Sequence, residues 1–168
     1  MPVTPDEFKT ALARFASGVT VVTLADDDGD HGMTASAFTS VSLDPPLVLV
    51  CVTKGNATHQ RLQGAGSFAI NILSSEQVTV SNRFAGWWDE GRSKWDDLTL
   101  TRGSVSGAPL IGGALAQLDC RTWSTADGGD HTIFIGQVEG ATVSPSAPGA
   151  LAPLLYFAGG YRNIGSAP

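Results

Sequence analysis

Three short stretches of the 168-residue chain combine residue types that could bind a ligand or take part in catalysis. Residues 34–40 are mostly small or hydroxyl-bearing, so a flat ligand could lie against their backbone N–H and C=O groups. Residues 54–59 lead from an apolar run into a predicted helix, where Lys54 and free backbone amides could bind a phosphate. Residues 128–136 place His131 directly after a glycine-rich turn, where its ring could stack on a second flat ligand or hydrogen-bond to it.

Each stretch also has an ordinary structural explanation. Residues 34–40 could form a strand whose small side chains make room for a large neighbour, and His131 could be a partly exposed residue at a strand start. For these two the local pattern alone favours the structural explanation. Residues 54–59 could be a plain capped helix start, or a phosphate site in which Asn56 is the N-cap or Thr58 donates its hydroxyl. The pattern supports these two alternatives about equally.

Several other chemistries lack their sequence signals. The chain has no GxSxG elbow, no GxxxxGK[ST] loop, no CxxC pair and no HxxH or HxxxH pair, and we expect no metal site. Residues 64–69 fit a loose GxGxx[GA] pattern, but these glycines follow a predicted helix and precede a strand. A dinucleotide fingerprint needs the opposite order, so they predict a turn. Cys51 and Cys120 lie in apolar runs and are expected to be buried free thiols.

Composition excludes further classes of partner. The chain is 42% hydrophobic and 15% charged, with a formal net charge of −6 and no cluster of basic residues. Nucleic acids and anionic membranes both require such clusters, so neither is expected as a partner. The clearest apolar run, residues 47–52, is far too short to span a bilayer, and no export signal is evident. A cytoplasmic location is therefore expected.

Strands dominate the predicted secondary structure. The continuous apolar run at residues 47–52 predicts a strand buried on both faces. Polar turns at residues 25–30 and 126–130 predict two hairpins. The 20 glycines and nine prolines agree with many tight turns. The other predicted strands, from β-branched runs and alternating patterns, are residues 20–24, 32–43, 67–73, 114–123, 131–143 and 154–157.

Helices are few and short. Thr4 and Glu7 form a predicted capping box at the start of the first helix. An apolar stripe follows, made of Phe8, Leu12 and Phe15, and Ser17 with Gly18 ends the helix. Residues 57–62 predict a second helix, and Ser74 with Gln77 predicts a capped third helix that ends near residue 84. Residues 87–97 have no clear period and are interpreted as a loop packed on the barrel or on a dimer partner, and residues 144–153 as another loop. The fold class is mainly β: a small β-barrel with peripheral helices, in a single domain of residues 1–168.

Four motifs in order resemble the short-chain flavin reductases, the small reductase components of two-component flavin-dependent monooxygenases. The similarity extends over nearly the whole chain, and its most specific part is the pair of segments around the small-residue strand. The matching segments are residues 15–23, residues 32–38 with 40–47, residues 129–136, and residues 154–157 with Tyr161.

This resemblance implies an FMN-binding split β-barrel that works as a homodimer, with the flavin near the subunit interface. The ring and ribityl chain would lie along Thr34, Ala35, Ser36, Ala37, Phe38 and Ser40, beside Cys51 and Val52. The phosphate would be surrounded by Lys54, Asn56, Ala57 and Thr58. Arg83 and Phe84 would close over the flavin, and His131 would meet the nicotinamide at the end of the site that holds Tyr156 and Phe157.

The implied reaction is hydride transfer from NADH or NADPH to FMN, with FAD as a possible flavin, followed by release of reduced flavin to a partner monooxygenase. Side chains offer no hydride acceptor, so two cofactors must meet, and the protein aligns them. His131 would position the nicotinamide. Two alternatives stay open: a split-barrel flavoprotein that retains its flavin and acts on an organic substrate, and a flavin-binding protein without turnover.

Overall fold

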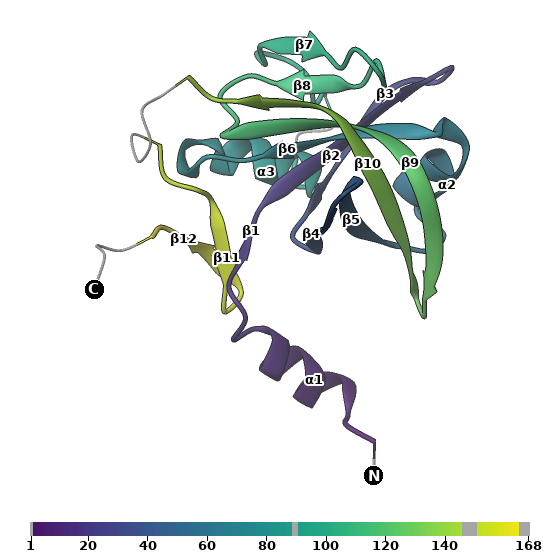
Figure 1. The fold of residues 1–168 in the computed structure, drawn as a ribbon. Coiled ribbons are helices and arrows are strands. Elements are labelled where there is room, and N and C mark those ends of the chain that lie inside the picture. The colour runs from purple at the N-terminus through teal and green to yellow at the C-terminus, as the bar shows by residue number, and fades with distance from the viewer. Residues whose placement is uncertain (1, 89–90, 146–150, 165–168) are drawn as a thin grey trace.

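The computed structural model describes residues 2–88, 91–145 and 151–164, and most of its strands form one strongly curved sheet (Figure 1). The N-terminal part contains α1 (Pro5–Leu12), β1 (Ser17–Gly18), β2 (Thr20–Asp26), β3 (Gly29–Ala35), β4 (Phe38–Leu43) and β5 (Pro46–Thr53). The middle contains α2 (Ala57–Ala65), β6 (Ser67–Ile72), the 3-10 turn η1 (Ser75–Gln77) and α3 (Val78–Phe84). The remainder contains β7 (Leu100–Arg102), β8 (Pro109–Ile111), β9 (Ala116–Gly128), β10 (His131–Val143), β11 (Leu155–Phe157) and β12 (Gly160–Arg162).

The seven-stranded sheet has the order β3-β2-β6-β9-β10-β5-β4, so its two edge strands follow each other in the chain. Only Ser36 and Ala37 separate these edges, and the Ala37 carbonyl accepts a hydrogen bond from the Cys51 amide at 3.0 Å. The sheet therefore rolls up until its edges approach. The prediction of one continuous strand over residues 32–43 is wrong, because the chain must change edges at Ser36 and Ala37.

Both predicted hairpins form, but their turns are tighter than the polar residues suggested. The strand β2 pairs with β3 as far as Asp26 opposite Gly29, and β9 pairs with β10 as far as Gly128 opposite His131. Gly29 and Gly129 adopt φ values of 94° and 79°, which favour glycine. The turns are short because the polar residues near each hairpin tip continue the backbone pairing of the strands.

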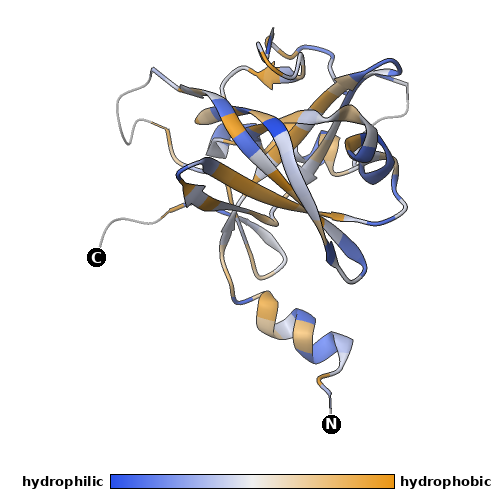
Figure 2. Cartoon of the chain, turned by 45° about the vertical axis from the view of Figure 1, so that its right-hand side comes forward, coloured by the Kyte–Doolittle hydropathy of each residue, from blue (hydrophilic) through white to orange (hydrophobic). Residues whose placement is uncertain are grey.

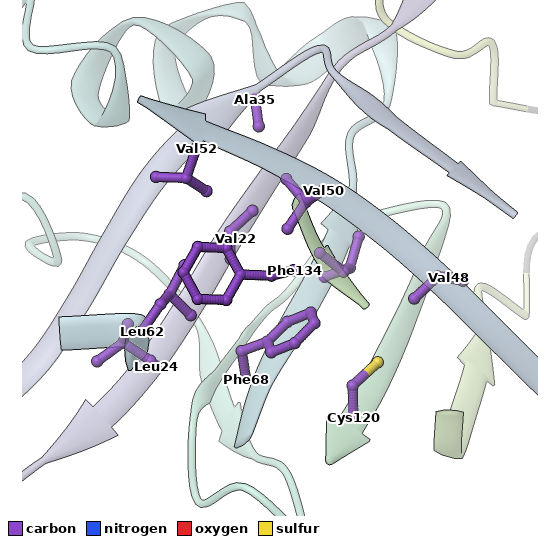
Figure 3. Close-up of a cluster of buried hydrophobic side chains, with 11 residues drawn as sticks. Val22, Leu24, Ala35, Val48, Val50, Val52, Leu62, Phe68, Cys120 and Phe134 are labelled. Carbon is purple, nitrogen blue, oxygen red and sulfur yellow. The ribbon is translucent and has the colours of Figure 1, made fainter. Parts of the chain in front are cut away.

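The barrel interior holds a dense apolar cluster, with the rings of Phe68 and Phe134 at its centre (Figure 3). From β5 only Val48, Val50 and Val52 are buried there. The residues between them are half-buried, so the predicted burial of residues 47–52 on both faces is wrong for the single chain. The physical reason is the alternation of side chains across a strand, which leaves one row outside the barrel.

The two cysteines, both free thiols, occupy different environments. Cys120 is buried in the core, and burial, with the nearby Asp119 carboxylate, raises the pKa of its thiol to about 12. Cys51 belongs to the outer row of β5 and is only half-buried, so the prediction of burial is wrong for this residue. Cys120 is thus a packing residue, whereas Cys51 lies at the surface of the barrel.

Helix α1 projects away from the barrel at the N-terminal end of the chain (Figures 1 and 2). The predicted capping box between Thr4 and Glu7 is confirmed. The helix ends at Leu12, before Phe15, and none of its residues is buried. Phe8, Leu12 and Phe15 are 56%, 50% and 73% exposed. The predicted apolar stripe therefore has nothing to cover it within the described part of one chain.

The other predicted helices are confirmed. Helix α2 runs further than the sequence suggested and ends at Gly66, whose φ of 68° makes the turn into β6. The second capping box, Ser74 with Gln77, is present and leads into α3. Within the described residues, no helix is long and apolar enough to cross a membrane. The predicted loop at residues 144–153 lies partly outside the described residues, which omit 146–150.

Candidate active site

A cavity of about 380 Å³ lies between the end of β3, helix α3 and the hairpin of β11 and β12. Thr34 and Ser36, from the predicted small-residue segment, line one side of it. Phe84, Trp87 and Tyr156 line other parts of its wall. This volume is in the range of small-molecule sites, and a mostly apolar wall with a few hydroxyl groups suits a flat aromatic ligand.

Hydrogen bonds fix the wall of the cavity before any ligand binds. The Thr34 hydroxyl donates to the Ser81 carbonyl at 2.6 Å, which ties β3 to α3. The Tyr161 hydroxyl lies 2.8 Å from Ser81 Oγ and donates to Asn82 Oδ1, also at 2.8 Å. These bonds connect α3 to β12 as well. The cavity is therefore preformed between three elements that are distant in the sequence.

Arg83 and Phe84, at the end of α3, are held by the segment that follows them. The Phe84 ring packs on Trp95 at 4.8 Å between centroids, and the residue is only 3% exposed. The Arg83 guanidinium donates to the Asp96 carbonyl and stacks 4.1 Å from the Trp88 ring centroid. Phe84 thus forms part of the cavity wall, and closure of either residue over a ligand would break these contacts.

The start of α2 has the local structure predicted for residues 54–59. The Asn56 side chain accepts a hydrogen bond from the His59 amide at 2.7 Å, so Asn56 is the N-cap. This leaves the Ala57 and Thr58 amides without an acceptor inside the helix. Lys54 Nζ lies 2.7 Å from Asp127 Oδ2, and the hydrogen bond that it donates lowers the pKa of that carboxyl. The lysine predicted to bind phosphate is therefore already paired with an acid.

Two histidine–threonine pairs position this helix start between strands. His31 Nε2 lies 2.7 Å from Thr58 Oγ1 and connects β3 to α2. His59 Nε2 lies 2.9 Å from Thr132 Oγ1 and connects α2 to β10. Burial lowers the pKa of His31, and the charges of two basic neighbours, Arg61 and Lys94, lower it further. Both effects favour the neutral form of the His31 ring, whose Nε2 faces the Thr58 hydroxyl.

His131 begins β10, opposite Thr53 at the end of β5. Its Nδ1 lies 2.7 Å from the Asp130 carboxylate, and its Nε2 lies 3.1 Å from Thr53 Oγ1. The hydrogen bond to His131 lowers the pKa of Asp130. Both ring nitrogens therefore have partners, which orient the ring at the rim of the barrel.

The strand β5 links the separate parts of the candidate site. Val52 is buried and pairs with Thr132, next to His131, while the Cys51 amide donates to the Ala37 carbonyl. The junction of β3 and β4, the end of β5 and His131 therefore lie at one end of the barrel. The loop after β5 leads from there to α2.

The remaining predicted residues have mixed placements. Ala35 is buried and Phe38 packs against the same core, so both side chains face the barrel interior. Ser40 is exposed on the edge strand, opposite Val48. Tyr156 and Phe157, on β11, line a second groove of about 640 Å³, next to Ser36 and Ala37. Because the Ala35 side chain faces the core, this residue could contact a ligand only through its backbone atoms.

A residue that contacts the start of α2, and a second that acts on it through its charge, are absent from the sequence prediction. His31 contacts Thr58, and Lys94 is close enough to lower the pKa of His31. Neither residue has a local sequence signal. The position of His31 depends on the register of the β2–β3 hairpin, and Lys94 lies in the irregular segment after α3. The adjoining Trp95, in a tryptophan-rich stretch, was the feature that could have drawn attention to this segment.

Comparison with known proteins decides the family. Residues 12–165 match the family model described as the flavin reductase like domain. The chain belongs to this family. It is 43% identical over 159 residues to an NADH-dependent FAD reductase from Streptomyces globisporus, covering 94% of this chain and 85% of that protein. It is equally identical, at 43% over 159 residues, to the reductase component of 4-hydroxyphenylacetate 3-monooxygenase from Thermus thermophilus, covering 95% and 96% of the two chains.

A solved structure supports the assignment to the flavin reductases independently. The Streptomyces globisporus NADH:FAD oxidoreductase, in complex with NAD and FAD fragments, superposes with a TM-score of 0.86 at 40% identity, covering 98% of this chain and 97% of that one. The family resemblance inferred from the four motifs is confirmed, and so is a mainly β, split-barrel fold with a few short helices.

Proposed function

We propose that this flavin reductase transfers hydride from NADH, or from NADPH, to FMN or FAD and releases the reduced flavin to a separate monooxygenase. The observation that carries the proposal is a small-molecule cavity lined by Thr34 and Ser36, at the junction that the Ala37–Cys51 hydrogen bond ties to β5. A helix start with free amides and His131 flank the end of the same strand. Further support comes from relatives named as NADH-dependent reductases and monooxygenase reductase components.

The residues at this end of the barrel suit a flavin mononucleotide moiety. The cavity beside Thr34 and Ser36 would take the ring system, with backbone groups of Ala37 and Cys51 nearby. The amides of Ala57 and Thr58 would receive the phosphate, because a helix N-terminus favours an anion. FAD carries the same moiety, so either flavin fits this part of the site.

The contribution of the chain to the reaction is alignment. The bound flavin supplies the centre that accepts hydride from the nicotinamide. Asp130 and Thr53 orient the His131 ring, which would hold the nicotinamide from the rim of the barrel. The hydroxyl-lined wall at Thr34 and the ring of Phe84 would fix the flavin plane and keep water from one side. A general acid or base is not required for hydride transfer itself.

The two residues expected to close over the flavin are held in place by their neighbours, which favours exchange of the flavin over permanent retention. Phe84 and Arg83 are engaged with Trp95, Trp88 and Asp96, so they form a wall rather than a cover. A reductase that supplies a separate monooxygenase must release its reduced product on each turnover. The cytoplasm, where NADH is available, is the compartment in which we place this reaction.

A homodimer would complete this site. Helix α1 has no buried residue, and its apolar side chains line the groove of about 640 Å³ that also contacts Ser36 and Ala37. The outer row of β5, which includes Leu49 and Cys51, is half-buried as well. A second copy of the chain that covers these surfaces would bury apolar area and place the flavin site at the subunit interface.

The first experiment follows NADH absorbance with purified protein at increasing FMN concentrations, repeated with FAD and with NADPH. We expect NADH oxidation that rises and saturates with added flavin, because flavin is a substrate. Activity that is independent of added flavin would instead indicate a retained flavin and an organic substrate. Flavin binding without oxidation of either nicotinamide would contradict the proposed reaction and indicate a binding protein.

A further inference from the structure

The hydroxyl groups of Thr34, Ser81 and Tyr161, on the wall of the cavity, are all engaged within the protein. The Thr34 hydroxyl donates to the Ser81 carbonyl at 2.6 Å. The Tyr161 hydroxyl donates its single proton to Asn82 Oδ1, so the Ser81 hydroxyl must be the donor in its own 2.8 Å contact with Tyr161. None of the described residues that line the cavity carries a charge. A ligand must therefore find its polar partners among the few uncharged groups that are left.

The side-chain amide of Asn82 is held at one end and free at the other. Asn82 lines the cavity from α3 and is half-buried. Its Oδ1 accepts from Tyr161, whereas its Nδ2 has no hydrogen-bond partner among the described residues. The end of the amide that remains for a ligand is thus the one with two N–H donors. These donors lose water when a ligand fills the cavity, so an acceptor on the ligand has to replace that water.

The hydrogen bonds form a directed chain that ends at this amide. Ser81 donates to Tyr161 and Tyr161 donates to Asn82, and each donation polarises the next group, which strengthens the Nδ2 donors. The Tyr161 ring is itself fixed, because it packs against the buried cluster beneath the cavity and edge-on against Tyr156, at 5.8 Å between centroids. A donor that is fixed in advance can bind an acceptor without first losing rotational freedom.

We infer that Asn82 donates a hydrogen bond to a carbonyl oxygen of the flavin ring, and that Tyr161 is the positioning residue that keeps the donor end of the amide free. The inference rests on the proposed function, which places the flavin ring in this cavity. One end of that ring carries carbonyl oxygens and the other is apolar. The apolar end suits the part of the wall formed by Val19, Met33 and Phe84. Because the contact is with the ring, FMN and riboflavin share it.

The first test measures the Kd for FMN and for riboflavin by the quenching of flavin fluorescence. We expect Asn82→Ala to raise both constants about three- to tenfold, the effect of losing one hydrogen bond. Asn82→Asp keeps an oxygen that accepts from Tyr161 and replaces the donor by a second oxygen, so it should raise both constants at least as much. If Asn82 served only as the partner of Tyr161, the aspartate variant would bind both flavins normally, and the inference would be wrong.

The matched control removes an asparagine of the same region that is not part of the cavity wall. Asn163 is exposed and lies directly after β12, so Asn163→Ala should leave both flavin constants unchanged. An increase in the KM for NADH in Asn82→Ala, with unchanged flavin constants, would place the contact on the nicotinamide instead and would overturn the inference.

A double-mutant cycle tests whether Tyr161 acts through Asn82. Tyr161→Phe keeps the ring that packs on Tyr156 and removes the hydroxyl. It should raise the Kd for riboflavin about threefold when Asn82 is present, and it should add nothing further in the Asn82→Ala variant. Equal effects in the two backgrounds would show that Tyr161 does not position the amide.

The Raman spectrum of bound FMN gives a readout that a purely structural role would not change. A hydrogen bond weakens the C=O bond, so a flavin carbonyl band should lie at lower frequency in the unchanged protein than in Asn82→Ala, with Tyr161→Phe between them. Carbonyl bands at the same frequencies in all three proteins would overturn the inference. These results differ from failure of the proposed function, in which the unchanged protein would bind no flavin or oxidise no NADH.

Discussion

His131 is held by two neighbours but keeps part of its ring at the surface. Its side chain is 39% exposed, while Asp130 contacts Nδ1 and Thr53 contacts Nε2. A ring that is fixed on its own strand can orient a ligand without first losing rotational freedom. The buried core does not depend on it, so this residue can be replaced without an effect on the barrel.

We predict that His131→Ala raises the KM for NADH about tenfold, the effect of losing one ordinary hydrogen bond or ring contact, and leaves the Kd for FMN unchanged within about twofold. Steady-state kinetics at saturating FMN measures the KM for NADH, and flavin fluorescence measures the Kd for FMN. Thr125→Ala, at an exposed position of the same hairpin, is the control and should alter neither. If FMN binding weakened as much as NADH use, a role for His131 in positioning the nicotinamide would be wrong.

Residue roles differ in how far the sequence determines them. Asn56 as an N-cap was predictable, because its acceptor and the His59 amide are three residues apart. The partner of Lys54 was not, because Asp127 is 73 residues away and is brought near only by the β5–β10 pairing. Lys94 stands in a segment without periodicity, so neither its exposure nor its neighbours follow from the local pattern.

At the scale of elements, hydrophobic periodicity predicted which segments are strands, and pairing between distant strands decided where they break. The run 32–43 has one composition throughout, yet it contributes to both edges of the sheet because the barrel closes between Ser36 and Ala37. Composition cannot show that break, since the break depends on the six strand pairings that roll up the sheet. Of the two small residues at the break, Ser36 also lines the candidate cavity.

The long strand β10 can cross the core because Gly136 lacks a side chain. A Cβ atom there would lie 2.5 Å from Phe68 Cζ and 3.0 Å from Cys120 Cβ. We predict that Gly136→Ala lowers the free energy of unfolding by about 1–3 kcal/mol through overpacking. Urea unfolding measures the change as a lower midpoint.

Gly64→Ala is the matched control, because Gly64 lies in α2 and a Cβ atom there would meet nothing within 4 Å. This substitution should raise stability by up to about 1 kcal/mol, since alanine is the better helix former. Equal effects of the two substitutions would show that the Phe68 contact does not constrain the barrel.

At the scale of the whole molecule, the main mismatch is apolar surface that one chain leaves uncovered. The sequence predicted an amphipathic first helix and a strand buried on both faces, and in the single chain both surfaces are open. The homodimer proposed above would bury both surfaces. Sequence periodicity records which surfaces are buried, and it does not distinguish burial within one chain from burial between two.

The proposed homodimer can be tested on α1. Phe8 and Leu12 are one turn apart on the same helix face and line the groove next to Ser36 and Ala37. We predict that the unchanged protein sediments with twice the mass of one chain. The double variant Phe8→Asp, Leu12→Asp should sediment with the mass of one chain, because two buried carboxylates would have to lose their hydration at the interface.

The same double variant should bind FMN at least about tenfold more weakly, because the groove it disrupts also contacts the flavin wall at Ser36. Thr10→Asp places a negative charge on the opposite face of the helix and should keep both the dimer and the FMN affinity. Since no residue of α1 is buried in one chain, these substitutions should not unfold the barrel, and urea unfolding checks this. A double variant that still sediments as a dimer would place the interface elsewhere, whereas a monomeric variant with unchanged FMN binding would separate the interface from the flavin site.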